Sequence, residues 1–520
     1  MLKFFVVILS FISLNTWGQS DFCSTRLDDM PVLAGGREKP LYILARESML
    51  FMTGKAMYEA MEPTEVFCRL SFQGFGVKHS LSPQIKVDHV DAKKLLAMKV
   101  DEKSIDVKEL INKKNIIGSE LERVIENNSY RKELLKIDQR LNAYVTIVSG
   151  EAWTVPVITN REVSFVPLRE FMTQERVDQN RTGMNPLVSM FAQAKKDYID
   201  MKGENFLLEL KYQKLNPFLW ALILSLISLC TFVLFKSQRI GIFFASLTIF
   251  LQISAMIMRI MISGRAPVTN MYETVMFSGF GALILGAFIS FIRRDKSFVL
   301  AGLSFNIMSL LMMKFANGML DPSISPLVPV LRDNLWLSTH VTTVILSYAA
   351  FALSWLLANG ALIRGRFFRL AESEKRYMSD LIYTCLKFGV VLLASGIILG
   401  GIWADYSWGR FWGWDPKETW SLIVLLIYMA ILHGRSTSWI RTERFIPMVA
   451  FAFLTVMMAW FGVNYILASG LHSYGFSEGG VVFLGTFFLS QIVVLLICLI
   501  KPKTKNDQES GLAQVQEVIF

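Results

Sequence analysis

The chain has 520 residues, of which 53% are apolar and 18% are charged, and its formal net charge at pH 7 is +10. From residue 217 onwards, apolar runs recur at about 20 residues each, the length that crosses a bilayer as a helix. This composition excludes a soluble enzyme and predicts an all-α polytopic membrane protein. The basic residues lie in short loops between the apolar runs, a distribution that argues against nucleic-acid binding.

The chain contains five scattered cysteines, and no two of them form a CxxC pair. This spacing excludes a dithiol redox pair, a zinc knuckle and a c-type haem attachment site. A disulfide between Cys23 and Cys68 is compatible with an exported location for that region, although nothing in the sequence requires it.

Residues 1–19 carry one lysine followed by the apolar run Phe4–Leu14, a pattern that resembles the core of a signal peptide. The residues Thr16-Trp17-Gly18 lack the small-residue pattern of a good cleavage site, so an uncleaved anchor is the alternative. Both interpretations export the chain that follows.

Residues 20–215 are polar and contain no long apolar run, which predicts an extracytoplasmic, mainly helical α+β domain. Helical periodicity across 94–142 indicates two or three amphipathic helices, and residues 187–212 are also predicted to be helical. Two stretches rich in Val, Ile, Thr and Phe, 152–158 and 163–167, predict a β-hairpin.

Residues 216–500 are predicted to form the membrane domain. They contain nine candidate spans, at roughly 217–235, 240–263, 273–292, 298–315, 341–363, 385–403, 419–434, 445–468 and 480–500. If the first span runs from outside to inside, every strongly basic loop lies in the cytoplasm, as the positive-inside rule requires. The tail at 501–520 is then cytoplasmic, and the loop at 403–420 lies outside.

Tryptophan is concentrated between the sixth and seventh predicted spans. Residues 408–420 read WGRFWGWDPKETW and hold four of the chain's twelve tryptophans, and Trp403 lies just upstream. An interfacial aromatic belt, the alternative, would spread tryptophan over many helix ends. The local concentration therefore favours a shelf that binds a flat apolar ligand.

The residues Asp415-Pro416-Lys417-Glu418 form a helix start signal. Asp at the cap, Pro at the first helical position and Glu at the third helical position are the preferred residues there. We therefore expect Asp415 and Glu418 to begin the seventh span and to tie the loop down, rather than to act as an acid and a base.

Histidine occurs five times in the chain. His79 and His89 lie in the polar region and are predicted to be ordinary surface residues. His340 lies at the outside end of the fifth span and His472 just past the eighth, so both map to the same side as the tryptophans. Two imidazoles that reach one iron from opposite faces, beside a flat aromatic surface, are what a haem requires.

Other polar groups near membrane level have two interpretations each. His433, at the inner end of the seventh span, indicates a second haem station because an ionisable group there is costly, or it extends to the headgroups as a structural residue. Arg259 and Arg265 could meet haem propionates or pair with Glu273, and the sequence does not decide between these.

The segment Trp408–Asp415, with its flanking outside-facing histidines and a histidine at the end of the next span, resembles the WWD superfamily of haem-handling proteins. The resemblance is closest to the CcsA/ResC component of system II cytochrome c biogenesis. Asn270-Met271-Tyr272-Glu273 and the segment from His340 to Tyr348 fit that family as well. The resemblance covers about residues 240–500.

The resemblance implies a holocytochrome c synthetase (haem lyase) component. Such a protein moves haem b across the membrane and presents it for thioether attachment to the CxxCH motif of apocytochrome c. It implies His340 and His472 as axial ligands of the haem iron, His433 as an inner station, and no acid–base residue. The residues that it implies for the shelf are Trp403, Trp408, Arg410, Trp412, Trp414, Asp415 and Trp420.

The resemblance also implies partners and a location. In the family a CcsB/ResB component supplies a second inner histidine, and the first two spans here contain none. We therefore expect a CcsB/ResB-like membrane partner, together with apocytochrome c and thiol-reducing proteins, in the bacterial cytoplasmic membrane. Residues 20–215 then dock a partner or the apocytochrome, or they form a stabilising cap.

Three other functions remain as alternatives. A haem-delivery protein of the CcmC type loads a chaperone and makes no thioether, but such proteins are shorter and lack the added exported domain. A cytochrome b-like electron carrier needs paired histidines inside the bundle, whereas the histidines here lie at membrane edges. A scaffold with an aromatic interface would bind no haem.

Overall fold

The chain folds into two units, residues 1–214 and 215–520. The signal-like segment 1–19, the tail 501–520, His79 and His472 lie outside the residues that the structure describes. The computed structural model describes residues 22–24, 27–75, 81–125, 128–174, 186–316, 318–325, 333–368, 370–467 and 480–500.

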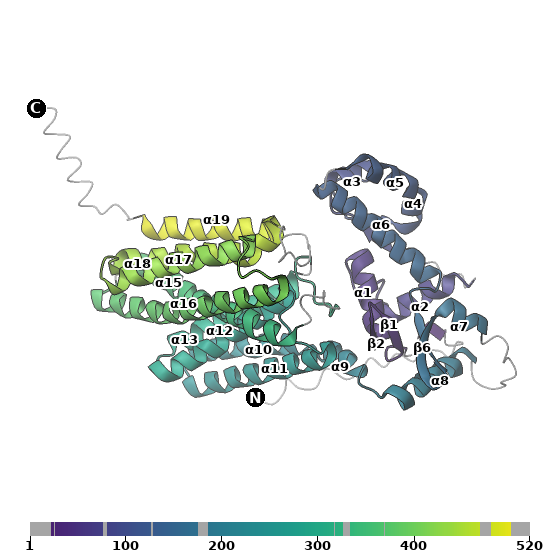
Figure 1. The fold of residues 1–520 in the computed structure, drawn as a ribbon, viewed down its shortest axis with the longest axis horizontal. Coiled ribbons are helices and arrows are strands. Elements are labelled where there is room, and N and C mark those ends of the chain that lie inside the picture. The colour runs from purple at the N-terminus through teal and green to yellow at the C-terminus, as the bar shows by residue number, and fades with distance from the viewer. Residues whose placement is uncertain are drawn as a thin grey trace, which may run out of the picture. The chain divides into compact units, whose positions relative to one another are not determined.

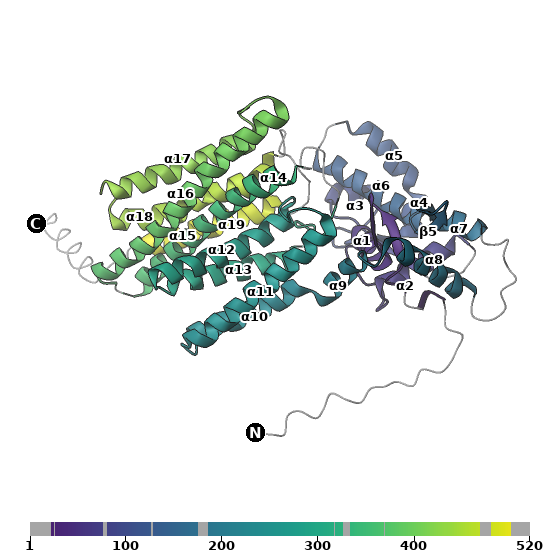
Figure 2. The same ribbon diagram turned by 60° about the horizontal axis from the view of Figure 1, so that its bottom comes forward.

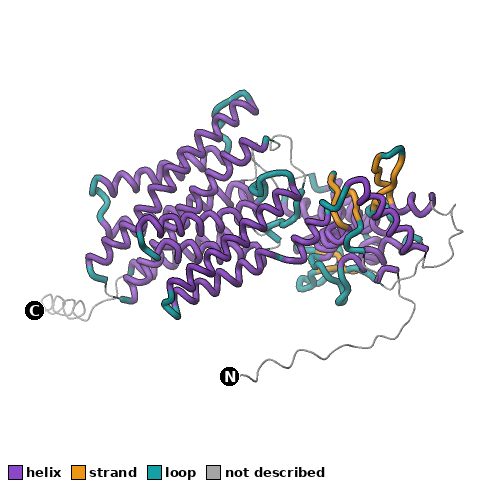
Figure 3. Tube along the Cα trace, turned by 90° about the horizontal axis from the view of Figure 1, so that it is seen from below, coloured by secondary structure: helices purple, strands orange, loops and turns teal. Residues whose placement is uncertain are grey.

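The N-terminal unit combines short helices with small antiparallel sheets, which confirms the predicted α+β composition. Its helices are η1 (Phe22–Ser24), α1 (Leu41–Thr53), α2 (Pro63–Gln73), α3 (Val90–Leu95), α4 (Val107–Asn112), α5 (Lys114–Arg123), α6 (Ser129–Val148), α7 (Leu168–Gln174), α8 (Pro186–Lys202) and α9 (Leu207–Leu215). Its strands, orange in Figure 3, pair as β1 (Pro31–Ala34) with β2 (Arg37–Pro40), β3 (Gln84–Lys86) with β4 (Ser104–Asp106), and β5 (Thr154–Thr159) with β6 (Glu162–Pro167).

The hairpin of β5 and β6 is the one that the sequence predicts. Asn160 and Arg161 form a two-residue turn, and both have positive φ, 53° and 62°. A turn of this kind matches the right-handed twist of the two strands that it joins. The structure also places α4, α5 and most of α6 where the helical periodicity predicts them.

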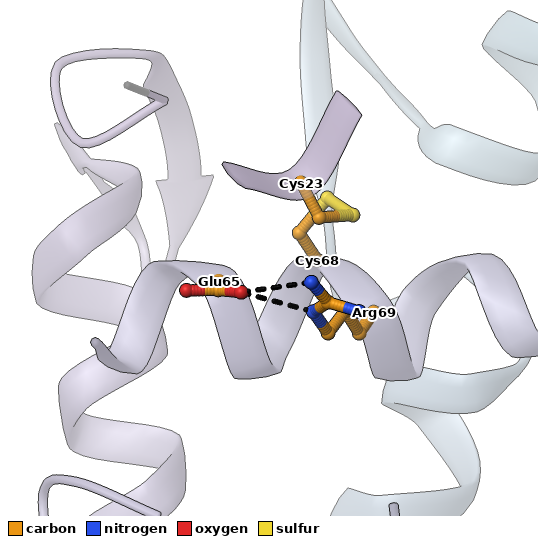
Figure 4. The surroundings of a disulfide bond; sticks show 4 residues. All are labelled: Cys23, Glu65, Cys68 and Arg69. Atoms are coloured by element: carbon orange, nitrogen blue, oxygen red, sulfur yellow. Dashed lines mark hydrogen bonds and ion pairs between the residues drawn. A yellow bond between two sulfur atoms is a disulfide. The ribbon is translucent and has the colours of Figure 1, made fainter. Parts of the chain in front are cut away.

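The core of the N-terminal unit is built around Trp153, which is fully buried. The rings of Phe67, Phe72 and Phe191 contact the indole, with centroids 5.2 to 6.2 Å away. Beside this core a disulfide joins Cys23 in η1 to Cys68 in α2, next to the Glu65–Arg69 ion pair on the same helix (Figure 4). The disulfide is the pairing that the sequence left open.

The C-terminal unit is a bundle of long helices that lie side by side (Figures 1 and 2). Among the described residues, nine helical segments are long and apolar enough to cross a membrane, so the chain is a multi-pass membrane protein. The elements are α10 (Pro217–Val233), α11 (Gln238–Ser263), α12 (Met271–Arg293), α13 (Ser297–Phe315), α14 (Asn334–Trp336), η4 (Leu337–Val341), α15 (Thr342–Phe367), α16 (Glu372–Trp408), α17 (Pro416–Ser436), α18 (Thr442–Met457), η5 (Met458–Leu467) and α19 (Gly480–Leu499).

Helix α16 corrects the predicted loop at 403–420. The helix has 37 residues and continues to Trp408, so Trp403 and Trp408 lie on its last turns and the connection to α17 is only Gly409–Asp415. The helix continues through Gly400 and Gly401, which keep negative φ, and it ends at Gly409, whose left-handed φ of 66° stops it. At 1.5 Å per residue α16 is about 55 Å long, well beyond a hydrocarbon core of about 30 Å.

The disulfide gives a first prediction. Replacing Cys23 and Cys68 by alanine removes a crosslink between positions 45 residues apart. The loop-entropy model predicts that the free energy of unfolding falls by about 4 kcal/mol. We expect the N-terminal unit of the full-length protein to become sensitive to limited proteolysis at a lower temperature. Cys230→Ala is the control, because Cys230 is a free, exposed cysteine.

Thiol labelling of the denatured, unreduced protein checks the bond directly. Three reactive thiols are expected, from the cysteines that the structure leaves free. Labelling of all five cysteines would contradict the disulfide.

Candidate functional site

An aromatic cleft opens at the end of the bundle where α16 ends and α17 begins. Its volume is about 1290 Å³ when its open mouth is included. Residues from the start of α12, from η4 and α15, from the end of α16, from the start of α17 and from η5 line it. Its aromatic wall is formed by Trp403, Trp408, Phe411, Trp412 and Trp460, and His340 faces it from η4.

The imidazole ring of His340 packs directly against α16. It lies on η4, a stretch of π-helix, an irregularity that is frequent at functional sites. Its Nδ1 lies 2.9 Å from the carbonyl oxygen of Gly396, and because a carbonyl only accepts, Nδ1 carries the proton. In the neutral ring the lone pair is then on Nε2, the arrangement that second-shell hydrogen bonds impose on metal-binding histidines.

Two glycines of α16 make room for this packing. A Cβ on Gly400 would lie 2.5 Å from Cε1 of His340, and a Cβ on Gly401 would lie 2.5 Å from the Phe411 ring. The edge of the His340 ring also meets Trp403, with the ring centroids 5.8 Å apart. The imidazole is therefore fixed by a hydrogen bond on one side and by close ring contacts on the others.

The connection between α16 and α17 is held by carboxylates, as the helix start signal predicts. The side chain of Glu418 accepts hydrogen bonds from the backbone N–H groups of Gly413 (2.7 Å) and Asp415 (3.2 Å). Asp415 is buried and caps α17, with Oδ1 2.8 Å from the Lys417 backbone nitrogen. These contacts confirm the capping box and give Asp415 and Glu418 a defined structural task.

Arg410 ties the middle of the connection to both neighbouring helices. Its guanidinium lies over the Trp408 ring, 5.7 Å from the centroid, and 3.5 Å from the Glu418 carboxylate. A Cβ on Gly413 would lie 1.3 Å from Nη1 of Arg410, so no side chain fits at position 413 while Arg410 holds this position.

Not every residue of the tryptophan motif faces the cleft. Trp414 is 69% exposed and has a positive φ of 56°. It contacts Trp412 edge-on, with the centroids 5.9 Å apart. Trp420 lies in the second turn of α17, and neither Trp414 nor Trp420 is among the residues that line the cleft.

Of the three histidines proposed from the sequence, His340 lines the cleft and His433, which was assigned to a separate inner station, lies away from it. His433 lies near the C-terminal end of α17, with Nδ1 2.9 Å from the Met429 carbonyl oxygen, and it is exposed. It stands 18 residues after Asp415, which is about 27 Å along the helix. His472 lies outside the described residues, so the structure neither joins it to His340 nor separates it.

The buried arginines pair with Glu273, one of the two roles that the sequence left open. Arg259 Nε lies 2.8 Å and Arg265 Nη1 lies 3.1 Å from the carboxylate of Glu273, and all three side chains are almost inaccessible to solvent. The arginines also donate to the backbone carbonyls of Pro322 and Ser325. This network fastens the segment after α13 to α11 and α12, and neither arginine lines the cleft.

Several cleft residues do not stand out in the sequence, and three of them bear on the chemistry of the site. Lys417, Trp460 and Asn464 all line the cleft. Lys417 stands inside the helix start signal, where capping explained its neighbours. The polar Asn464 in the apolar run of the eighth span, one helical turn after Trp460, is the signal that could have found the other two.

Comparisons with known proteins address this region directly. Residues 268–472 match the family model described as "Cytochrome C assembly protein". The protein NrfI of Wolinella succinogenes is 27% identical over 491 residues, which is 84% of this chain and 53% of NrfI. The chain therefore spans about half the length of that relative.

Two shorter relatives match less than half of this chain. The cytochrome c biogenesis protein CcsA of Guillardia theta is 34% identical over 239 residues, 41% of this chain and 78% of that protein. The CcsA protein of Prochlorococcus marinus strain MIT 9312 is 35% identical over 248 residues, 42% of this chain and 79% of that protein.

The packing of His340 on α16 gives a second prediction. Gly400→Ala places a methyl group where the imidazole lies. We expect this overpacking to lower the free energy of unfolding by about 1–3 kcal/mol. Gly360→Ala in α15 is the matched control, because a Cβ there meets nothing within 4 Å. Thermal unfolding of each detergent-solubilised variant measures the effect. Equal melting temperatures for the two variants would show that the His340 ring does not rest on Gly400.

Proposed function

Since this chain belongs to the CcsA family of cytochrome c assembly proteins, we propose that its aromatic cleft holds haem b. The haem is the substrate, and the cleft presents it for covalent attachment to apocytochrome c. We propose the chain as a component of a holocytochrome c synthetase, with its own residues positioning the reactants.

The observation that carries this proposal is the state of His340. Its Nδ1–H donates to Gly396, so the lone pair of the neutral ring is on Nε2, the atom that ligates iron in such an arrangement. The ring lines the aromatic cleft. Haem iron in bis-histidine proteins takes one imidazole on each face, and we propose His472 as the second ligand.

The rest of the cleft fits a porphyrin. Trp403, Phe411 and Trp412 offer apolar ring surface of the kind that stacks on a flat macrocycle. The indole N–H of Trp403 is buried and has no hydrogen-bond partner among the described residues, and a buried donor of this kind indicates a polar group supplied by a ligand. Trp408 belongs to the same wall. We propose that Arg410, Asp415 and Trp414 support it through the contacts that hold the connection in place, and that Trp420 belongs to the same haem-binding region.

The proposed reaction needs positioning more than proton transfer. Each cysteine thiol of the CxxCH motif adds across one vinyl C=C bond, so that a C–S bond forms, the proton goes to the other vinyl carbon and nothing leaves. Fixing both reactants in one geometry makes such an addition effectively intramolecular. The histidine of the motif would replace one of the two protein ligands of the iron.

His433 supports the proposal of a second, inner haem station. It lies at the end of α17 remote from the cleft, and its exposed ring is accessible to another chain. We propose that a CcsB/ResB-like partner supplies the second ligand there. The basic helix ends on this side would then face the bacterial cytoplasm, with the aromatic cleft on the periplasmic side.

We also propose that the N-terminal unit is periplasmic and docks the partner or apocytochrome c. Its Cys23–Cys68 disulfide supports an oxidising compartment, because such bonds are rare in cytosolic proteins. Thiol-reducing proteins would keep the client cysteines reduced in that compartment.

Haem retention tests the site. The purified protein should show a bis-histidine haem spectrum, and His340→Gly should lower the haem content by about tenfold or more because an axial ligand is lost. Free imidazole should restore part of it by filling the space. His89→Ala, in the N-terminal unit, is the control and should retain haem; unchanged haem in His340→Gly would remove the cleft from the proposal.

Covalent product tests the reaction. Co-expression with a reporter apocytochrome and a CcsB/ResB-like partner, in a host that lacks its own assembly system, should yield cytochrome that keeps its haem on a denaturing gel. His433→Gly should reduce this yield while the cleft still binds added haem. A protein that binds haem and gives no covalent product would favour haem delivery of the CcmC type instead.

A further inference from the structure

Two polar side chains that line the aromatic cleft, those of Lys417 and Asn464, contact each other. The Nζ of Lys417 in the first turn of α17 donates to Oδ1 of Asn464 in η5, at 3.2 Å, and both residues line the cleft. Asn464 is itself held in place, because its Nδ2 donates to the Trp460 carbonyl oxygen at 2.7 Å and approaches the Met271 sulfur at 3.0 Å. The amide therefore presents its oxygen to the ammonium and fixes where the charge lies.

The Lys417 ammonium forms no ion pair in the described part of the chain, although the carboxylate of Asp415 acts on its charge from a greater distance. The two carboxylates nearest in sequence are engaged with the backbone: Asp415 accepts from the backbone N–H of Lys417, and Glu418 accepts from Gly413 and Asp415. No described carboxylate oxygen comes within 4 Å of Nζ. An ammonium has three N–H donors, and the amide of Asn464 accepts one of them.

Helix architecture does not explain a cation at this place. The first turn of a helix is its positive end and favours acidic side chains, so a lysine there is unfavourable for α17. An ionisable group within a span is also costly, and such groups mark functional positions. Arg259 and Arg265 show the contrasting structural case, since both are paired with Glu273.

We propose that Lys417, positioned by Asn464, binds a propionate carboxylate of the porphyrin. This inference rests on the proposed function of the cleft. A haem carries both propionates on one edge and both vinyl groups on the opposite edge. An anchor at Lys417 therefore turns the vinyl edge away from the junction of α17 and η5.

The anchor at Lys417 determines which edge of the haem faces the junction of α17 and η5. Other contacts must determine which of the haem's two faces points towards His340. Rotating the haem by half a turn about the axis through these two edges exchanges the two pyrrole rings that carry the vinyl groups and leaves a propionate at the anchor. The unequal groups that line the cleft, with His340 and Trp403 in contact with each other, are then what distinguishes the two orientations.

Comparing haem with haem dimethyl ester tests the anchor without any variant. Esterification removes the negative charges and leaves the macrocycle, the iron and the vinyl groups intact. In spectrophotometric titrations of the purified haem-free protein, we expect the wild type to bind haem about tenfold more tightly than the ester, as for one charged hydrogen bond. Equal affinities would overturn the proposal.

Substitution then assigns the effect to one residue. Lys417→Gln should bind haem about as weakly as the wild type binds the ester, and should bind the ester with an affinity within about twofold of wild type. Lys387→Gln in α16 is the control, because Lys387 lies against Tyr383 and outside the cleft, and it should keep the preference for haem.

Two results distinguish a failure of the anchor proposal from a failure of the proposed haem site. If Lys417→Gln weakens haem and ester equally, its role is structural and the anchor is overturned while the haem site stands. If the wild type binds neither haem nor ester, the proposed function falls and the anchor falls with it. Asn464→Leu should lower the preference for haem less than Lys417→Gln does, because it moves the ammonium without removing its charge.

Discussion

The contact between His340 and α16 is the constraint on which the rest of the candidate site depends. The Gly396 carbonyl accepts from Nδ1 and so determines the tautomer, while the missing side chain of Gly400 lets the ring lie directly against the helix. Both conditions are met by backbone atoms, so the position of the imidazole is as rigid as the helix pair itself. An imidazole held in this way presents one ring nitrogen in one direction, as the haem-binding role proposed for His340 requires.

The charges near the cleft divide into two kinds. Glu273 neutralises part of the charge of Arg259 and Arg265 in a buried network, where removing one partner would leave an uncompensated charge. Lys417 has an amide as its partner instead. The first arrangement fastens a segment to the bundle, and the second leaves a positive charge directed at the cleft, so similar residue types serve different purposes within the same helical unit.

The tryptophan motif also serves two purposes. Trp408 and Trp412 line the cleft, whereas Trp414 is exposed and Asp415 and Glu418 cap α17. The caps and the Arg410 contacts leave the short connection little freedom, and this restraint keeps the aromatic wall in one arrangement. A motif that looks like one binding surface in sequence is therefore a wall together with the structure that supports it.

The amino-acid sequence alone determined the features that depend on neighbours along the chain: the apolar lengths of the spans, the hairpin at residues 154–167 and the start of α17 at Pro416. It did not show that α16 continues past Trp403 to Trp408. Several glycines lie around this stretch, and the sequence does not tell which of them ends the helix; the structure shows that it is Gly409. Only the tertiary structure decided the pairing of Glu273 with both arginines, the disulfide of Cys23 with Cys68, the tryptophans that face the cleft and the meeting of Lys417 with Asn464. These depend on the direction in which side chains point between helices that are far apart in the chain, and hydrophobic periodicity carries no information about that direction.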